Sequence, residues 1–147
     1  MKSVHCELCS PDLSPVLGES AYWRIVLNRR QNLLGKVYLA LNRHCEAVAE
    51  ITPEEWSDLH DQIVRVTSLL KERFQPDHFN FLFLMNQDRH AHIHIVPRYA
   101  ADRHFGGAQF CDTDWPGAFP SLDSGPSVDP EMEAALTAAL QLTHSPS

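Results

Sequence analysis

Residues 90–96, HAHIHIV, alternate histidine with small or apolar residues. Successive side chains of a β-strand point to opposite faces, so the alternation predicts a strand over His90–Val96, ended by Pro97. One face of this strand carries Ala91, Ile93 and Ile95 and can pack on a helix. The opposite face carries three imidazoles in register. Three histidines in register favour a strand that lies between an apolar core and a polar site, the alternative being a solvated sheet face on which the histidines have no role.

A hairpin and a long helix are predicted before this strand. The aromatic and β-branched run Tyr22–Leu27 and the run Val37–Leu41 are typical of two strands joined by a turn. Thr52 is a good N-cap, with a proline at the first helical position and Glu55 completing a T-x-x-E capping box. A helix over Pro53–Phe74 follows, because apolar residues recur there every three or four positions: Trp56, Leu59, Ile63, Val66, Leu70 and Phe74.

The remaining elements complete an α+β pattern. Residues 1–20 contain several breakers and are expected to be irregular, Phe79–Met85 reads as a buried strand, and Asn86–Arg89 as a turn. Gly106-Gly107 marks a loop, and a final helix is expected to begin at Asp129-Pro130. The fold class is therefore α+β: an antiparallel sheet of about five strands, a long helix packed on it, and a C-terminal helix.

Length and charge restrict the classes of partner. A chain of 147 residues has the size of one domain, and 44% hydrophobic residues are enough for a substantial core. The net charge is -7, from 12 Lys+Arg against 19 Asp+Glu, which argues against nucleic acid and anionic membrane as partners. The sequence contains no apolar run of about 20 residues and no apolar signal core near Met1, so a cytoplasmic protein is expected.

Three kinds of chemistry suit the histidine face when only the residues are considered. Neutral imidazole is a common metal ligand, and two histidines at alternate positions of a strand can bind one ion. Imidazole also exchanges protons near neutral pH, and its nitrogen can attack an electrophile to give a covalent intermediate. The pattern alone leaves these three roles open.

The same residues resemble a known family. Residues 90–96 match the His-φ-His-φ-His-φ-φ signature (φ is apolar) of the histidine triad (HIT) superfamily of nucleotide hydrolases and transferases, and the flanking residues 86–89 and 97–100 are similar to its bacterial members. The resemblance spans about 21–110. It implies a HIT-like fold in which residues 1–147 form a single domain, with an irregular N-terminal segment and a C-terminal helical tail. It also implies a homodimer.

The resemblance implies a role for each histidine of the motif. His92 would attack the α-phosphate of a nucleotide to give a nucleotidyl-histidine, with its other ring nitrogen bonded to a backbone carbonyl. His94 would donate to the phosphate or the leaving group. Asn28 would bind the ribose, and Asn86 and Gln87 the phosphates, although all three also suit turns.

The resemblance also implies a class of substrate. Dinucleoside polyphosphates or nucleoside phosphoramidates are expected, with no organic cofactor. The turn at residues 86–89 is shorter than in many HIT hydrolases, which leaves the preferred leaving group open. The alternative is a nucleotide-binding regulatory module with little turnover.

A Cys-x-x-Cys pair, Cys6 and Cys9, forms a second motif. Without a secretory signal a disulfide is poorly supported, and a metal is the leading explanation. The resemblance implies a zinc ion held by Cys6, Cys9, His44 and His90, a closed set suited to a structural ion. A reduced metal-free pair and a set that uses Cys45 are the alternatives.

Overall fold

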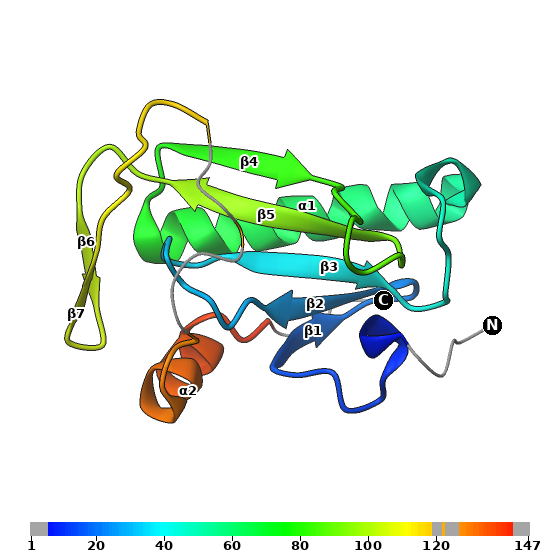
Figure 1. The fold of residues 1–147 in the computed structure, drawn as a ribbon, viewed down its shortest axis with the longest axis horizontal. Helices are drawn as coiled ribbons and strands as arrows, with labels where there is room; N and C mark the ends of the chain where they lie inside the picture. The colour runs from blue at the N-terminus through cyan, green and yellow to red at the C-terminus, as the bar shows by residue number, and fades with distance from the viewer. Residues whose placement is uncertain (1–5, 119–121, 123–126, 143–147) are drawn as a thin grey trace.

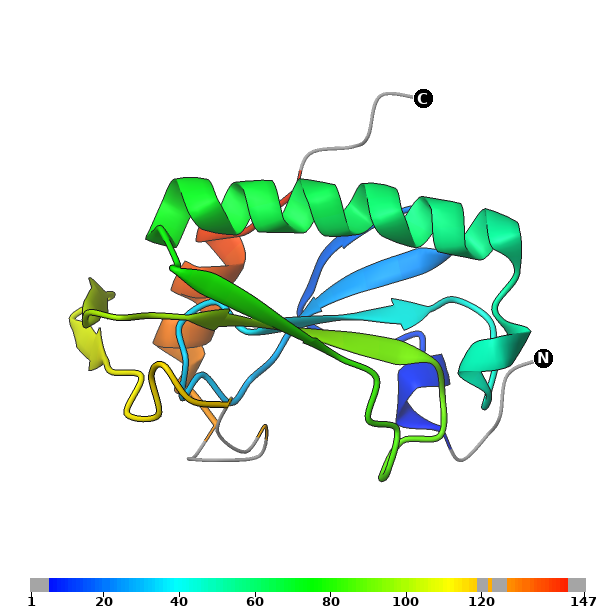
Figure 2. The same cartoon turned by 90° about the horizontal axis from the view of Figure 1, so that it is seen from above.

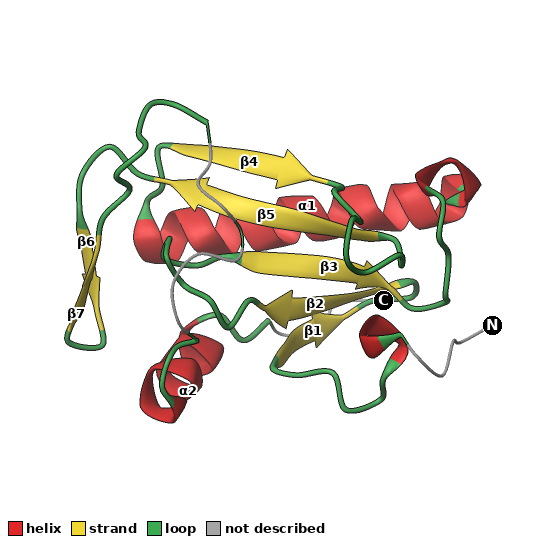
Figure 3. Ribbon diagram, in the orientation of Figure 1, coloured by secondary structure: helices red, strands yellow, loops and turns green. Residues whose placement is uncertain are grey.

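A computed structural model describes residues 6–118, 122 and 127–142. Its main sheet is antiparallel and has the strand order β1-β2-β3-β5-β4 (Figure 1). The strands are β1 (Val16–Glu19), β2 (Trp23–Leu27), β3 (Val37–Leu41), β4 (His78–Leu82) and β5 (His92–Arg98). With the two helices in Figure 3, this arrangement confirms the predicted α+β class and the five-stranded sheet.

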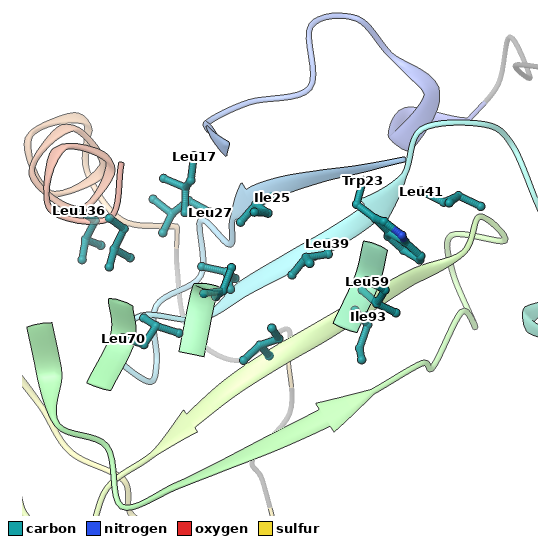
Figure 4. Packing of buried hydrophobic residues seen from close by; sticks show 14 of the residues in the cluster. Leu17, Trp23, Ile25, Leu27, Leu39, Leu41, Leu59, Leu70, Ile93 and Leu136 are labelled. Carbon is teal, nitrogen blue, oxygen red and sulfur yellow. The ribbon is translucent and has the colours of Figure 1, made fainter. Parts of the chain in front are cut away.

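The long helix α1 (Pro53–Phe74) has the predicted boundaries. Its first turn is closed by the capping box: the Thr52 side chain accepts from the Glu55 N–H, and the Glu55 carboxylate accepts from the Thr52 N–H. The helix covers one face of the sheet (Figure 2). The core between them contains Leu59, Val66, Leu70 and Phe74 of the helix together with Trp23, Ile25, Leu39 and Ile93 of the strands (Figure 4).

One residue of the predicted apolar stripe lies at its margin. Trp56 is 40% exposed and contacts Phe83 at a ring-centroid distance of 5.8 Å. It lies at the end of the first turn of α1, beside Phe83 in the segment that follows β4. The helix therefore packs on the sheet through its later apolar positions.

The second helix α2 (Pro130–Ala139) is capped by Asp129, whose side chain accepts from the Met132 N–H. Leu136 and Leu140 are buried in the same core as α1. After the helix, the Leu142 N–H donates to the Leu17 carbonyl at 2.9 Å. The predicted C-terminal helix is thus confirmed, and it packs beside β1 rather than on the face occupied by α1 (Figures 1 and 2).

Residues expected to be irregular contain two short elements. The 3-10 turn η1 (Glu7–Cys9) is followed by β1, which pairs with β2 through a register shift between Val16 and Gly18. β1 was not predicted, because a strand of only four residues that contains a bulge has almost no hydrophobic periodicity.

The strand of histidines is shifted relative to its prediction. β5 begins at His92 rather than His90 and continues through Pro97 to Arg98. Pairing with β3 stops at Ile95, so Pro97 is paired only with Phe79 of β4. A proline is accommodated where one side of the strand lacks a ladder partner. β4 is also shorter than predicted and ends at Leu82.

The expected loop at Gly106-Gly107 is the turn of a hairpin. Strands β6 (Arg103–Phe105) and β7 (Ala108–Phe110) pair on either side of it. Both glycines have positive φ, 57° and 79°. Two consecutive residues with positive φ are the geometry of a tight hairpin turn, which glycine adopts without strain.

A buried ion pair fixes the chain that follows this hairpin. The Arg98 guanidinium donates to both carboxylate oxygens of Asp112, at 2.7 and 3.1 Å, and the Tyr99 N–H donates to the same carboxylate. The side chains of the pair are 2% and 0% exposed. The pair holds the segment after β7 against the sheet face opposite α1 (Figure 2).

In the described part of the chain, neither helix combines the length and the apolar character needed to cross a membrane.

Candidate active site and metal centre

His92 lies at the start of β5 and is 5% exposed. Its Nδ1 is 2.6 Å from the His90 carbonyl oxygen. A carbonyl can only accept, so Nδ1 carries the proton and Nε2 keeps a lone pair. This is the backbone hydrogen bond expected of a nucleophilic imidazole.

His94 is the second histidine of the strand, and its ring lies 4.8 Å from the His92 ring. Burial, then the neighbouring His92 and Lys36, lower the pKa of His94 to about 4. His94 is therefore neutral at neutral pH. Its Nδ1 is buried without a hydrogen-bond partner among the described residues.

Tyr38 of β3 lies opposite the two histidines. It pairs with His94 across the sheet, and its ring is 6.2 Å from the His92 ring and 6.0 Å from the His94 ring. Burial, followed by the charge of Asp88, raises the pKa of Tyr38 to about 12. Its phenol stays protonated and can donate a hydrogen bond to a ligand.

These side chains face a cavity of about 280 Å³. Tyr38, His92 and His94 line it from the sheet, Asn28 and Arg29 from the end of β2, and Asp88 from the turn before β5. The wall on the other side comes from the segment around η1, through Glu7, Leu8, Leu13 and Ser14. The cavity thus joins the histidine face of the sheet to the first described residues of the chain.

The three predicted substrate-binding residues have different positions. Asn28 lines the cavity, and its Oδ1 also accepts from the Arg30 N–H at 2.9 Å, so a turn bond and a cavity position coexist. Asn86 and Gln87 are exposed, and the turn reaches the cavity through Asp88 instead. The binding roles of Asn28, Asn86 and Gln87 stay predictions.

The four predicted metal ligands come together. One donor atom from each of Cys6, Cys9, His44 and His90 lies within 4.8 Å of the others. His90 Nδ1 is 3.4 Å from both sulfur atoms, and His44 Nδ1 is 3.4 Å from Cys9 Sγ. A tetrahedral zinc ion with bonds of about 2.0–2.3 Å separates its nitrogen and sulfur ligands by about 3.5 Å. The donor set and its spacing fit such an ion.

The orientation of His90 also fits a metal ligand. Its ring is fully buried, and Nε2–H donates to the Leu41 carbonyl at 2.6 Å, which leaves the Nδ1 lone pair directed at the cysteines. Burial lowers the pKa of His90, so the imidazole is neutral, as a ligand must be. A backbone acceptor on the second nitrogen is the usual support of a ligating histidine.

The metal cluster and His92 share a backbone group. His90 offers its ring to the cysteines and its carbonyl oxygen to His92 Nδ1. Whatever fixes the His90 ring also fixes the carbonyl that orients the nucleophile candidate. The remaining described cysteines lie apart from this cluster: Cys45 is buried and donates to the Ala47 carbonyl, and Cys111 is exposed.

The sequence alone did not reveal several residues of the cavity. Tyr38 could have been found, because it alternates with core residues of β3 and must share the face of the histidines. Leu8, Leu13 and Asp88 carried no signal, since their positions depend on how irregular segments close over the sheet.

No family model matches the chain. A bis(5'-adenosyl)-triphosphatase from Dictyostelium discoideum is 30% identical over 82 residues, which are 52% of this chain and 55% of that protein. The match thus spans about half the length of this curated relative.

Solved structures share the fold over most of the chain. A histidine triad protein from Marinobacter aquaeolei VT8 is 25% identical, with a TM-score of 0.67 and coverage of 86% of this chain and 85% of that one. A histidine triad protein from Bradyrhizobium japonicum is 19% identical, with a TM-score of 0.68 and coverage of 88% and 89%. These similarities show the fold of histidine triad proteins, and together with the motif His90–Val96, which runs into β5, they support membership of the histidine triad superfamily.

Proposed function

We propose that the protein is a nucleotide hydrolase or nucleotidyl transferase that acts at the α-phosphate through a covalent nucleotidyl-histidine. The observation that carries the proposal is the hydrogen bond from His92 Nδ1 to the His90 carbonyl at 2.6 Å. It directs the lone pair of Nε2 away from the backbone, and His92 lines the cavity beside His94 and Tyr38.

The proposed reaction has two steps. In the first, His92 Nε2 forms a bond to phosphorus while the bond from phosphorus to the leaving group breaks, and the leaving group departs with the electron pair and takes up a proton from solvent. The positive charge that develops on the ring is shared with the His90 carbonyl through Nδ1–H. In the second, water or another acceptor attacks phosphorus and releases its proton to solvent, and the P–N bond breaks with its electron pair returning to Nε2, so His92 is neutral again.

His94 and Tyr38 are proposed to stabilise the phosphoryl group. Neutral His94 carries one N–H, and the phenol of Tyr38 carries one O–H, so each can donate to a phosphate oxygen. Asn28 is proposed to bind the ribose, and Asn86 and Gln87 to contact the phosphates.

The substrates we propose are dinucleoside polyphosphates or nucleoside phosphoramidates. The similarity to a bis(5'-adenosyl)-triphosphatase supports a substrate with a phosphoanhydride bond. The second candidate function, a nucleotide-binding module with little turnover, is disfavoured because binding alone does not require the tautomer of His92 to be fixed. No organic cofactor is invoked, and a cytoplasmic location stays a prediction, as does the assignment of residues 1–147 to one domain.

Turnover by His92→Ala tests the proposed nucleophile. We expect the variant to lose hydrolysis of a substrate panel (diadenosine triphosphate, adenosine and guanosine phosphoramidates), by about 10³-fold or more in kcat. His94→Ala should lower kcat while leaving nucleotide binding intact. His60→Ala, at a side chain 78% exposed on α1, is the matched control and should keep wild-type rates. Equal turnover by wild type and His92→Ala would refute the nucleophile.

We further propose a structural zinc ion at Cys6, Cys9, His44 and His90, supported by the spacing of the four donor atoms. When bound, the ion supplies a crosslink between the first described residues and the strand region of His90. Burial raises the pKa of the Cys6 thiol above its ordinary value, so its thiolate needs a cation nearby.

A homodimer is the proposed assembly. β4 is the last strand of the sheet, and Phe81 on it is 46% exposed. Trp56 and Leu84 nearby in the fold are 40% and 47% exposed. An unpaired edge beside exposed apolar side chains is a surface that a second copy can cover.

A further inference from the structure

One segment belongs both to the metal centre and to the nucleotide cavity. In Cys6–Ser14, the first and fourth residues are metal ligands in the proposed site, and the second and third, Glu7 and Leu8, line the cavity. Leu13 and Ser14 continue the same wall. Leu8 therefore lies between the two cysteines and forms part of the surface that a nucleotide would contact.

Few bonds of the protein itself hold this segment in place. The η1 turn has only three residues, too short to be stable alone. The Arg24 guanidinium of β2 donates to the Leu8 carbonyl and, at 2.9 Å, to the Ser10 carbonyl. At the far end the Arg29 guanidinium donates to Ser14 Oγ at 3.1 Å, and the Leu27 N–H donates to the Pro15 carbonyl at 2.9 Å. Between these attachments, the cysteines are the main link to the sheet region around His90.

We propose that the metal ion and the nucleotide bind cooperatively, because the metal holds the Cys6–Ser14 wall of the cavity in its binding position. This proposal rests on the proposed nucleotide site. A nucleotide that binds to the metal-free protein has to order this wall, and the entropic cost of ordering lowers the nucleotide affinity. Coupling between two ligands is reciprocal, so a bound nucleotide tightens metal binding by the same factor.

Arg24 is a positioning residue in this proposal. It is neither a proposed metal ligand nor a lining residue of the cavity. It bonds to two carbonyls of the segment, and its charge also acts on His90 and on Tyr38. Its removal should loosen the wall while all four metal ligands remain.

The experiment measures two affinities with defined probes on the full chain. AMP and GMP are titrated calorimetrically into the zinc-loaded and the chelated protein. Co²⁺ is titrated with and without saturating AMP, because thiolate-to-cobalt absorption reports occupancy of the cysteine site and not of other histidines. We expect nucleotide affinity to be about tenfold or more weaker without metal, and Co²⁺ affinity to rise by a similar factor with AMP present.

Two variants keep the test decisive if the chelated protein unfolds. Arg24→Ala should weaken AMP binding in the zinc-loaded protein and weaken Co²⁺ binding, by about three- to tenfold each. Arg24→Lys, which retains one donor group, should recover part of both affinities. Arg73→Ala removes an exposed arginine of α1 and is the matched control, with neither affinity changed.

The outcomes separate this inference from the proposed function. If the zinc-loaded protein binds neither AMP nor GMP, the proposed nucleotide site is wrong, and the coupling with it. If AMP binds with the same affinity within about twofold with and without metal, while turnover still depends on His92, only the coupling is wrong. A fall in AMP affinity for Arg24→Ala with unchanged Co²⁺ affinity also contradicts the coupling.

Discussion

His94 is a histidine whose pKa lies well below the ordinary value for imidazole. Burial, then the nearby charges of His92 and Lys36, lower its pKa to about 4, from an ordinary value of about 6.5. The folded protein therefore holds His94 neutral over a range in which the unfolded chain takes up a proton. Sequence could place His94 on the cavity face but not give this shift, which depends on the side chains packed around it.

The shift predicts how stability depends on pH. Between about pH 6.5 and 4 the unfolded state binds more protons than the folded state, so the free energy of unfolding falls as the pH is lowered through this window. Below about pH 4 this contribution no longer changes. His94→Gln removes the titrating group, so wild type should lose on the order of 2 kcal/mol more than the variant across the window.

Urea unfolding of both proteins at half-unit intervals of pH measures the difference. Other buried groups, including His90, are present in both proteins and cancel in the comparison. Parallel pH curves for wild type and variant would contradict the depressed pKa.

At the scale of elements, boundaries were predictable where local chemistry sets them. α1 begins and ends as expected because its N-cap, proline and apolar spacing act within the helix. The limits of β5 depend on its partner strands. The strand passes through Pro97 because β3, whose first residue pairs with Ile95, does not extend as far as Pro97. The bulged β1 and the three-residue η1 are held by β2 and Arg24, neither of which a local pattern encodes.

The two cysteines at η1, Cys6 and Cys9, lead to a prediction of the metal content of the protein. Protein purified without a histidine tag should contain about one zinc ion per chain, bound by a set of four donors. Cys6→Ser should contain little zinc, because a hydroxyl is a poor replacement for a thiolate. Cys111→Ser, at an exposed cysteine outside the cluster, is the control and should keep its zinc.

Elemental analysis after gel filtration decides this prediction. Wild-type protein without zinc would contradict the proposed centre. Equal zinc in wild type and Cys6→Ser would show that the ion is held by other residues.

At the scale of the molecule, the sheet has two faces with different partners. One face is covered by α1, and α2 joins the same apolar core from its place beside β1. The other face is covered by η1, the turn before β5 and the chain after β7 (Figure 2). The first face was predictable from hydrophobic periodicity. The second was not, because it is closed by irregular segments through single contacts such as Arg98 with Asp112.

The open edge of the sheet leads to a prediction about assembly. Wild type should sediment at twice the 16.7 kDa mass of the chain, and Phe81→Lys should sediment as a monomer, because a charge on an edge strand opposes pairing. Tyr22→Lys changes another exposed aromatic residue, 39% exposed and away from β4, and should stay dimeric. A monomeric wild type at micromolar concentration would contradict the proposed dimer.

The buried pair of Arg98 and Asp112 also bears on the order in which the chain becomes stable during synthesis. All five strands of the main sheet have been made once Arg98 is added, yet the carboxylate that neutralises its guanidinium arrives 14 residues later. In the complete fold, removing that carboxylate leaves a buried cation unpaired, at a cost on the order of 3–5 kcal/mol. A nascent chain that stops short of Asp112 thus has every strand of the main sheet but lacks the carboxylate that pairs with Arg98.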